Sequence, residues 1–474
     1  MMKHGWVVSK WVIRFVSGLV FIVGISRHGA LARVEWEGQY RLEIMELSST
    51  DLGDGGAKSV VLSRLNLRPY VVIGDGARAI FSFEVLPNQQ YPNDQFGTIL
   101  GQGAYLDQHN RLDRPSGSLA VRESYFRWEQ ENAEFQFGRV PLQFGKGLYF
   151  SSGRDFFDHF SNQWDALVAR IQVGHLILQP GFGRLVQQGA EKGNASHDMI
   201  LSVWYDNPDA RAVLGVLYQT RSGHKGYQNG QLIPYGASAI ESGWNTNATL
   251  LYFSRYWEEV YLEMEAGFEA GQTGLVTAGS ESIDLGGYGI NVDFGYQGPG
   301  SDWSYLLRAG IASGDDPNTA RYEGFQWNRN FDVAFILANH PVGQYDVLRS
   351  GRRRNFNYNN TPPVPYPVVQ ALDEESVSNM FYLAPQITKS INRQWKWKHR
   401  LVWAQAHVTP SLQPNTSRDL GFEYDVGLEY WSSQRWLWLM ELGIFAPGSA
   451  FKGGDSNYPN QLVWGWQVKS SYQF

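Results

Sequence analysis

Hydrophobic and polar residues alternate with a period of two over long parts of the chain, and residues 257–271 show the pattern most clearly. One face of this segment carries Val260, Leu262, Met264, Ala266, Phe268 and Ala270, and the other carries Tyr261, Glu263, Glu265, Gly267 and Glu269. Residues 395–408 and 419–431 repeat the pattern. A helical period of 3.6 would scatter each set around the helix. The alternation therefore predicts strands with one apolar and one polar face.

The alternation divides the chain into 18 segments. They lie near residues 35–47, 59–73, 77–87, 118–130, 133–141, 163–172, 175–186, 197–206, 210–221, 243–255, 257–271, 282–296, 302–313, 379–391, 395–408, 419–431, 435–446 and 462–474. An even number of strands of about 10 residues is typical of bacterial membrane barrels. We therefore predict an all-β fold, a transmembrane antiparallel β-barrel of about 18 strands.

The links between these segments fall into two sets that alternate along the chain. Links after odd-numbered segments include the long stretches 88–117, 142–162, 222–242 and 314–378. Links after even-numbered segments include the short stretches 74–76, 173–174, 207–209 and 432–434, which are rich in Gly, Asn, Asp, Pro and Ser. If the first strand starts on the periplasmic side, this order predicts long extracellular loops and short periplasmic turns.

The last segment ends on an aromatic residue. Its apolar face carries Leu462, Trp464, Trp466, Val468, Tyr472 and Phe474. A terminal Phe after such a face resembles the signature by which outer-membrane barrels are recognised, so the barrel-assembly machinery is an expected partner through Phe474. The last strand must also pair with the first, around residues 36–44, because a membrane barrel leaves no open edge.

The N-terminus has the features of a secretory signal peptide. Lys3, Lys10 and Arg14 precede an apolar run at residues 15–25, and small residues follow at 30–32. The run is shorter than the roughly 20 residues that a membrane helix needs. We therefore expect a signal peptide at 1–32, cleaved after Ala32, and a barrel at 33–474. Cleavage would leave 36 basic against 46 acidic residues, a charge of −10, which argues against nucleic acid as a partner.

The amino-acid composition further limits the classes of protein to which the chain can belong. The chain has no Cys, which excludes disulfides, thiolate metal sites and a Cys nucleophile. Charged residues make up 18% and aromatic residues 15%, whereas an ordinary soluble protein has roughly 25% charged residues. No G-x-S-x-G or H-E-x-x-H motif is present, so a barrel enzyme using Ser/His or Asp/His pairs is a minor alternative. We expect neither a cofactor nor a metal.

A barrel of this width leaves an aqueous channel, so the inward side chains are the candidate site. The basic candidates are Arg64, Arg68, Arg78, Arg122, Arg139 and Arg170, and the acidic candidates are Glu263, Glu265, Glu269 and Asp293. Two interpretations stay open: the two walls set a transverse field across the lumen, or the charges pair locally with neighbouring strands. Lys396, Lys398 and Arg400 lie beside the acidic strand 419–431, which predicts a local salt-bridge ladder.

Three links, 88–117, 142–162 and 314–378, are long enough to enter or cover the pore, and loops of this length are usually functional or disordered. The last one carries Arg352, Arg353 and Arg354. These arginines would either attract an anionic polymer or fold against carboxylates such as Asp373, Glu374 and Glu375. The loop could also serve an adhesin or a receptor.

Two stretches resemble the alginate export family, 18-stranded barrels that pass a polyuronate across the outer membrane. The first reads FGRVPL at 137–142 and continues through FG at 144–145 to WDAL at 164–167. The second reads ASGDDPN at 312–318, followed by Phe331, Asp332, His340, Gly343 and Asp346. The resemblance implies that Arg122, Arg139 and Asp165 face the lumen.

These observations favour a passive outer-membrane channel for small charged or saccharide solutes. The resemblance adds a narrower hypothesis, the export of an anionic polysaccharide such as alginate. The expected partners are membrane lipid, lipopolysaccharide, and small solutes or an anionic polysaccharide. A surface adhesin or receptor acting through 314–378 is the main alternative.

Overall fold

The structure is a computed structural model, and it describes residues 33–54, 56–74, 76–85, 104–106, 112–115, 120–185, 196–223, 237–240, 244–277, 282–316, 319, 321–340, 342, 376–409, 417–452 and 456–474. The expected signal peptide lies outside these residues and stays a prediction.

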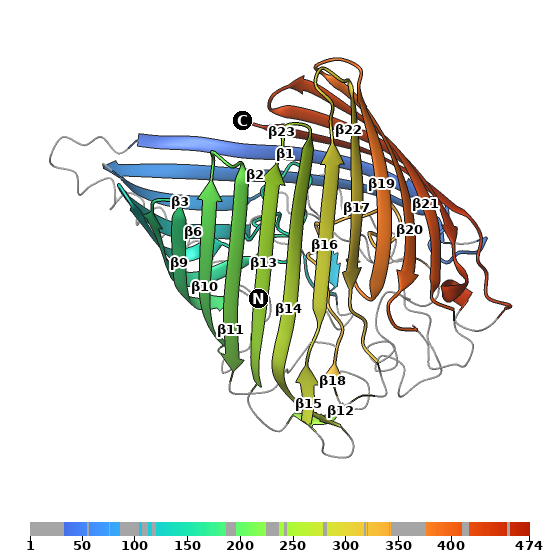
Figure 1. Ribbon diagram of the computed structural model, residues 1–474, viewed down its shortest axis with the longest axis horizontal. Helices are drawn as coiled ribbons and strands as arrows, with labels where there is room; N and C mark the ends of the chain where they lie inside the picture. Colours follow the sequence, from blue (N-terminus) through green and yellow to red (C-terminus); the bar gives the residue numbers. More distant parts are fainter. Residues whose placement is uncertain are drawn as a thin grey trace, which may run out of the picture.

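Eighteen long strands form one closed antiparallel barrel (Figure 1). They are β1 (Arg33–Leu47), β2 (Lys58–Gly74), β3 (Ala77–Glu84), β6 (Ala120–Gln130), β7 (Ala133–Pro141), β8 (Gln163–Val173), β9 (Leu176–Leu185), β10 (Ser196–Asn207), β11 (Ala212–Gly223), β13 (Trp244–Tyr256), β14 (Val260–Thr277), β16 (Tyr288–Tyr296), β17 (Trp303–Ala312), β19 (Met380–Ser390), β20 (Trp395–Ala406), β21 (Asp419–Ser433), β22 (Trp436–Pro447) and β23 (Val463–Gln473). Each pairs with its neighbours, and β23 pairs with β1. The predicted all-β barrel and its strand number are confirmed.

Short strands extend the barrel wall or lie apart from it. They are β4 (Ala104–Leu106), β5 (Leu112–Pro115), β12 (Ala237–Ile240), β15 (Ser282–Leu285) and β18 (Arg321–Tyr322), and a 3-10 turn covers Ser449–Lys452. The predicted strand 282–296 is therefore two strands, β15 and β16. The chain departs from the ladder between them, where the Gly286 backbone N–H donates to the Tyr322 carbonyl at 2.8 Å.

The strand ends that carry the two kinds of link lie at opposite ends of the barrel (Figure 1). The short turn between β8 and β9 passes through Gly174, whose φ of 59° lies in the left-handed region that glycine adopts without strain. The long links leave from the other end, where β12, β15 and β18 also lie. This arrangement agrees with the predicted alternation of loops and turns.

The barrel closes at its last residue. The backbone N–H of Phe474 donates to the Gly38 carbonyl at 3.0 Å, and the Gly38 N–H donates to the Phe474 carbonyl at 3.0 Å. The Phe474 ring covers Gly38 so closely that a Cβ at Gly38 would lie 2.2 Å from it. The predicted seam between the last strand and residues 36–44 is therefore confirmed.

Apolar side chains cover the outside of the barrel and polar ones line the inside. Leu167, Phe422 and Trp464 are examples of exposed outward residues, whereas Glu265 and Asp425 are buried inward residues. Among the described residues, no helix has the length and apolar character needed to span a membrane. The buried core of the protein lies inside the barrel, where loop segments pack against the wall.

Candidate functional site: the narrowed lumen

Two loop segments fold into the lumen. One is residues 142–162, between β7 and β8, and it packs with Ile80, Tyr125 and Trp164 of the wall. The other, named the 325–342 segment, consists of the described residues 325–340 and 342 in the long link after β17, and it packs against strands on both sides of the seam. The candidate site is the passage that these two segments narrow.

The 142–162 segment begins at the acidic wall. Glu265, which has no exposed surface, accepts the backbone N–H groups of Lys146 at 2.9 Å and Tyr149 at 3.3 Å. Lys146 Nζ lies 2.5 Å from Asp293 and 3.1 Å from Glu263. The predicted acidic residues thus hold a loop in place, because carboxylates satisfy its backbone N–H groups and its ammonium group.

Two further contacts secure the same end of the segment. Glu269 accepts a hydrogen bond from the Tyr149 hydroxyl. Gly145 has a φ of 52°, and a Cβ there would lie 2.6 Å from Glu265 Oε2. Glycine is required at this position because the backbone approaches the wall so closely in a left-handed conformation.

The segment then crosses to the early strands. Arg41 and Arg64 donate to the Asp158 carbonyl at 2.6 and 2.8 Å. His159 Nε2 lies 2.8 Å from Glu43. Burial, with the neighbouring charge of Asp155, raises the pKa of the Asp158 carboxyl above its usual value. The loop is thereby fixed at both walls by polar contacts.

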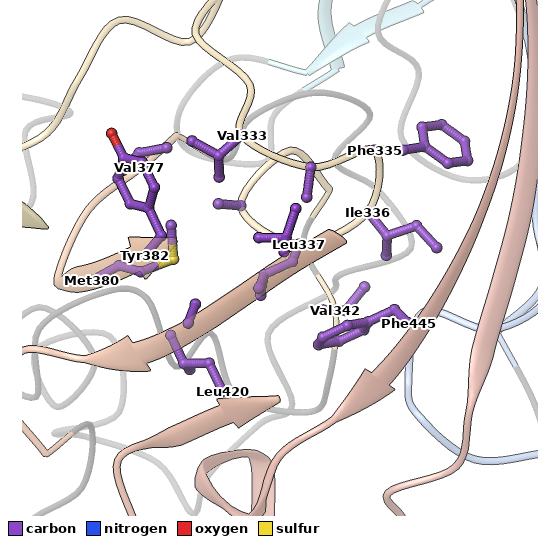
Figure 2. Close-up of a cluster of buried hydrophobic side chains, with 14 of the residues drawn as sticks. Val333, Phe335, Ile336, Leu337, Val342, Val377, Met380, Tyr382, Leu420 and Phe445 are labelled. Atoms are coloured by element: carbon purple, nitrogen blue, oxygen red, sulfur yellow. The ribbon is translucent and has the colours of Figure 1, made fainter. Parts of the chain in front are cut away.

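The 325–342 segment is held by a different pair of carboxylates. Glu423 accepts the N–H groups of Ile336 at 2.6 Å and Leu337 at 2.7 Å, and Asp425 accepts that of Phe335 at 3.1 Å. The side chains of residues 333–338 are fully or almost fully buried. Figure 2 shows this apolar run beside wall residues of β19, β21 and β22. They include Met380, Tyr382, Leu420 and Phe445.

The two segments contact each other inside the lumen. Asn328 donates its backbone N–H to the Leu148 carbonyl at 2.6 Å and its side chain to Asn162 at 2.9 Å. The rings of Tyr149 and Phe325 have centroids 5.8 Å apart. The lumen is therefore bridged from wall to wall by two hydrogen-bonded segments.

The predicted basic residues on the early strands are interleaved with carboxylates. Glu84 lies 2.5 Å from both Arg64 and Arg122, and Glu123 lies 2.8 Å from Arg68. Arg122 reaches the lumen because the register between β3 and β6 shifts beside it. This wall therefore fits the interpretation that the charges pair locally with neighbouring strands better than the interpretation that a basic wall sets a transverse field across the lumen. Glu84 and Glu123 were missed, although both alternate with apolar residues as inward side chains do.

Arg78 and Arg170 lie on the inward faces of β3 and β8, nearer the short turns, and both are exposed. The predicted ladder between β20 and β21 is confirmed. Lys398 pairs with Glu429, and Arg400 lies 2.8 Å from Asp425.

Two predicted lumen residues were assigned to the wrong face. Arg139 alternates with Phe135 and Phe137 on β7, and Asp165 alternates with Leu167 on β8. The exposed apolar neighbours show that this face is the outside of the barrel. Arg139 was placed among the inward basic residues of the early strands and Asp165 followed the family resemblance, and both assignments disagree with the alternation along β7 and β8.

Arg352, Arg353 and Arg354, and the carboxylates Asp373, Glu374 and Glu375, lie outside the described residues. The two interpretations of the arginine triplet therefore stay open. Lys146 and the apolar run 333–338 were not singled out from the sequence. An apolar run inside a long loop is a signal for burial that could have been used.

An 18-stranded antiparallel barrel with an apolar exterior, a polar lumen and inserted loops has the architecture of an outer-membrane porin. Solved structures with the same fold are OccK9 (OpdG) of Pseudomonas aeruginosa, a BenF-like porin of Pseudomonas fluorescens, and the outer membrane protein OpdK of Pseudomonas aeruginosa. Their TM-scores are 0.53, 0.52 and 0.51 and their identities 11%, 11% and 12%, and each comparison covers 93% of this chain and 98% of the other. No family model and no curated protein matches the sequence. The comparisons show the fold, and they do not single out the alginate export family.

Proposed function

We propose that the protein is a passive channel of the bacterial outer membrane for small charged or saccharide solutes. The observation that carries this proposal is the lumen itself. A barrel of 18 strands is too wide for wall side chains alone to fill. Here two loop segments, held by carboxylates of β14 and β21 and joined to each other, reduce that opening to a polar passage.

The polar groups around the segments suit small solutes that carry both charge and hydroxyl groups. Carboxylates and guanidinium groups alternate along the early strands, and Arg154 lies 3.1 Å from Glu123 while staying 41% exposed. Arginine forks bind carboxylates with two parallel hydrogen bonds. One protein of the same fold, OccK2 (OpdF) of Pseudomonas aeruginosa, was solved in complex with glucuronate, at 11% identity and a TM-score of 0.51. A sugar acid of this kind is the first solute to test.

The narrower hypothesis, export of an anionic polysaccharide such as alginate, rests on the sequence resemblance. A polymer would need a continuous passage past both inserted segments. The adhesin or receptor alternative acts through the loop 314–378, of which residues 343–375 lie outside the described part of the chain. The partnership with the barrel-assembly machinery through Phe474 also stays a prediction.

Single-channel recording of the refolded protein in a planar bilayer tests the proposal. We expect a small, steady conductance that glucuronate reduces at millimolar concentration. Block by a long oligouronate, but not by the monomer, would favour polymer export instead. A folded barrel with no conductance at any voltage would overturn the channel proposal and favour an adhesin or a receptor.

A further inference from the structure

Arg139, Asp165 and Arg184 form a charged row on the outside of the barrel. They are register partners on three adjacent strands, β7, β8 and β9. Arg139 binds Asp165 with two hydrogen bonds of 2.9 and 3.3 Å. Arg184 Nε lies 4.0 Å from the same carboxylate, and its side chain is 60% exposed. The row therefore has an excess of one positive charge, and Arg184 presents it outwards.

The next outward row toward the short turns is apolar. It consists of Phe137, Leu167, Phe182 and Met199, which are register partners on four adjacent strands and are each more than half exposed. A charge on the lipid-facing side is costly at the bilayer centre but costs only about 0–1 kcal/mol near the interface. The depth of the charged row in the membrane therefore determines whether it contacts acyl chains or lipid headgroups.

The row lies at the long-loop end of its strands. Arg139 lies two residues before the end of β7, and Arg184 lies one residue before the end of β9. Asp165 is eight residues from Val173, where β8 meets its short turn. That distance is about 26 Å along a strand, or about 20 Å of membrane depth at the usual strand tilt, against an apolar band of about 25 Å. If Val173 marks the inner edge of the apolar band, the charges thus lie about 5 Å inside its outer edge, close to the interface.

We infer that Arg139 and Arg184 bind the phosphate of a phosphorylated lipid in the outer leaflet, with its acyl chains lying along Phe137, Leu167 and Phe182. Arginine matches phosphate oxygens with a planar fork of donors. Asp165 orients Arg139 and also repels the phosphate, so it limits the affinity. This inference depends on the outer-membrane location and not on conduction, so channel recording and lipid binding can fail independently.

The test is a titration of bisphosphorylated lipid A into the folded, full-length protein in detergent micelles, followed by native mass spectrometry. We expect the double variant Arg139→Gln/Arg184→Gln to bind about tenfold more weakly. Asp165→Asn should bind about threefold more tightly, because it removes the repulsion. Arg255→Gln is the matched control, since Arg255 is an exposed residue of β13 at the short-turn end and stacks on Trp257. Heat-modifiable migration in electrophoresis checks that each variant is folded.

Equal binding of lipid A by the double variant and the unmodified protein would overturn the inference. Equal binding of dephosphorylated lipid A would overturn it too, because no phosphate would then be recognised. Full competition by millimolar inorganic phosphate would show a site for the free ion rather than a lipid. A change of oligomeric state in the double variant, without a change in lipid affinity, would identify the row as a contact between copies of the chain.

Discussion

The two segments inside the barrel are anchored in opposite ways. The 325–342 segment buries a continuous apolar run, and the carboxylates Glu423 and Asp425 accept hydrogen bonds from its backbone N–H groups. The 142–162 segment also packs apolar side chains against the wall, but charged contacts hold it at two places, through Lys146 at one wall and His159 at the other. Apolar burial involves no charge that salt could screen, whereas ion pairs respond to pH, salt and charged solutes. We therefore expect the 325–342 segment to stay fixed in the lumen and the 142–162 segment to move in response to pH, salt or charged solutes.

The largest effect should come from breaking the apolar anchor. Leu337→Asp would place an unpaired carboxylate in a site without exposed surface and beside Glu423, which costs several kcal/mol. The 325–342 segment should leave the wall, and single-channel conductance should rise severalfold. Leu337→Met is the control, because it conserves volume and polarity. An unchanged conductance in folded Leu337→Asp would mean that this segment does not narrow the passage.

A smaller effect should follow when the polar anchor is weakened. Glu265→Gln replaces one carboxylate oxygen with an NH2 group, which faces a backbone N–H of the 142–162 segment and costs about 1–3 kcal/mol. Conductance should become noisier and increase less than in Leu337→Asp. Glu429→Gln is the control, since Glu429 pairs with Lys398 of the wall. Equal noise in both variants would contradict a specific role for Glu265.

A change of selectivity should follow from Lys146→Met. The ammonium group lies between Asp293 and Glu263, and Asp293 also pairs with Arg308, so the substitution removes one positive charge and leaves Glu263 without its ion pair to Lys146. The reversal potential in asymmetric salt should shift toward cation selectivity, and Glu263→Gln should shift it toward anion selectivity. Variants that move the reversal potential in the same direction would show that these side chains do not set the selectivity.

The smallest effect concerns the pH dependence at Asp158. Burial and the charge of Asp155 raise the pKa of the Asp158 carboxyl in the folded protein above its pKa in the unfolded chain. Ionisation of Asp158 therefore opposes folding once the pH exceeds the pKa in the unfolded chain. Asp158→Asn should therefore raise the thermal midpoint by a few degrees at pH 7 and leave it unchanged at pH 3. Thermal unfolding of both proteins at the two pH values provides the measurement. Destabilisation at pH 7 would mean that the charge supports the loop.

The strand number and the closing seam could be predicted because alternation and edge closure are local rules that each strand must obey. The inserted segments could not. The contact between Glu265 and Lys146 joins residues 119 apart, and no periodicity marks it. Arg139 and Asp165 show the opposite case, since their own alternation with Phe137 and Leu167 already indicated the outward face.

The side chain of Asn330 joins the 325–342 segment to the 142–162 segment. Its Oδ1 accepts the backbone N–H groups of His159 and Phe160, each at 2.9 Å, and its Nδ2 donates to Ser151 at 3.1 Å and to the Phe160 carbonyl at 2.7 Å. This uses both donors and both acceptor positions of the amide. Either segment can shift only if all four bonds are lost together. Rearrangement of the passage should therefore be cooperative, seen as discrete current steps rather than as a graded drift.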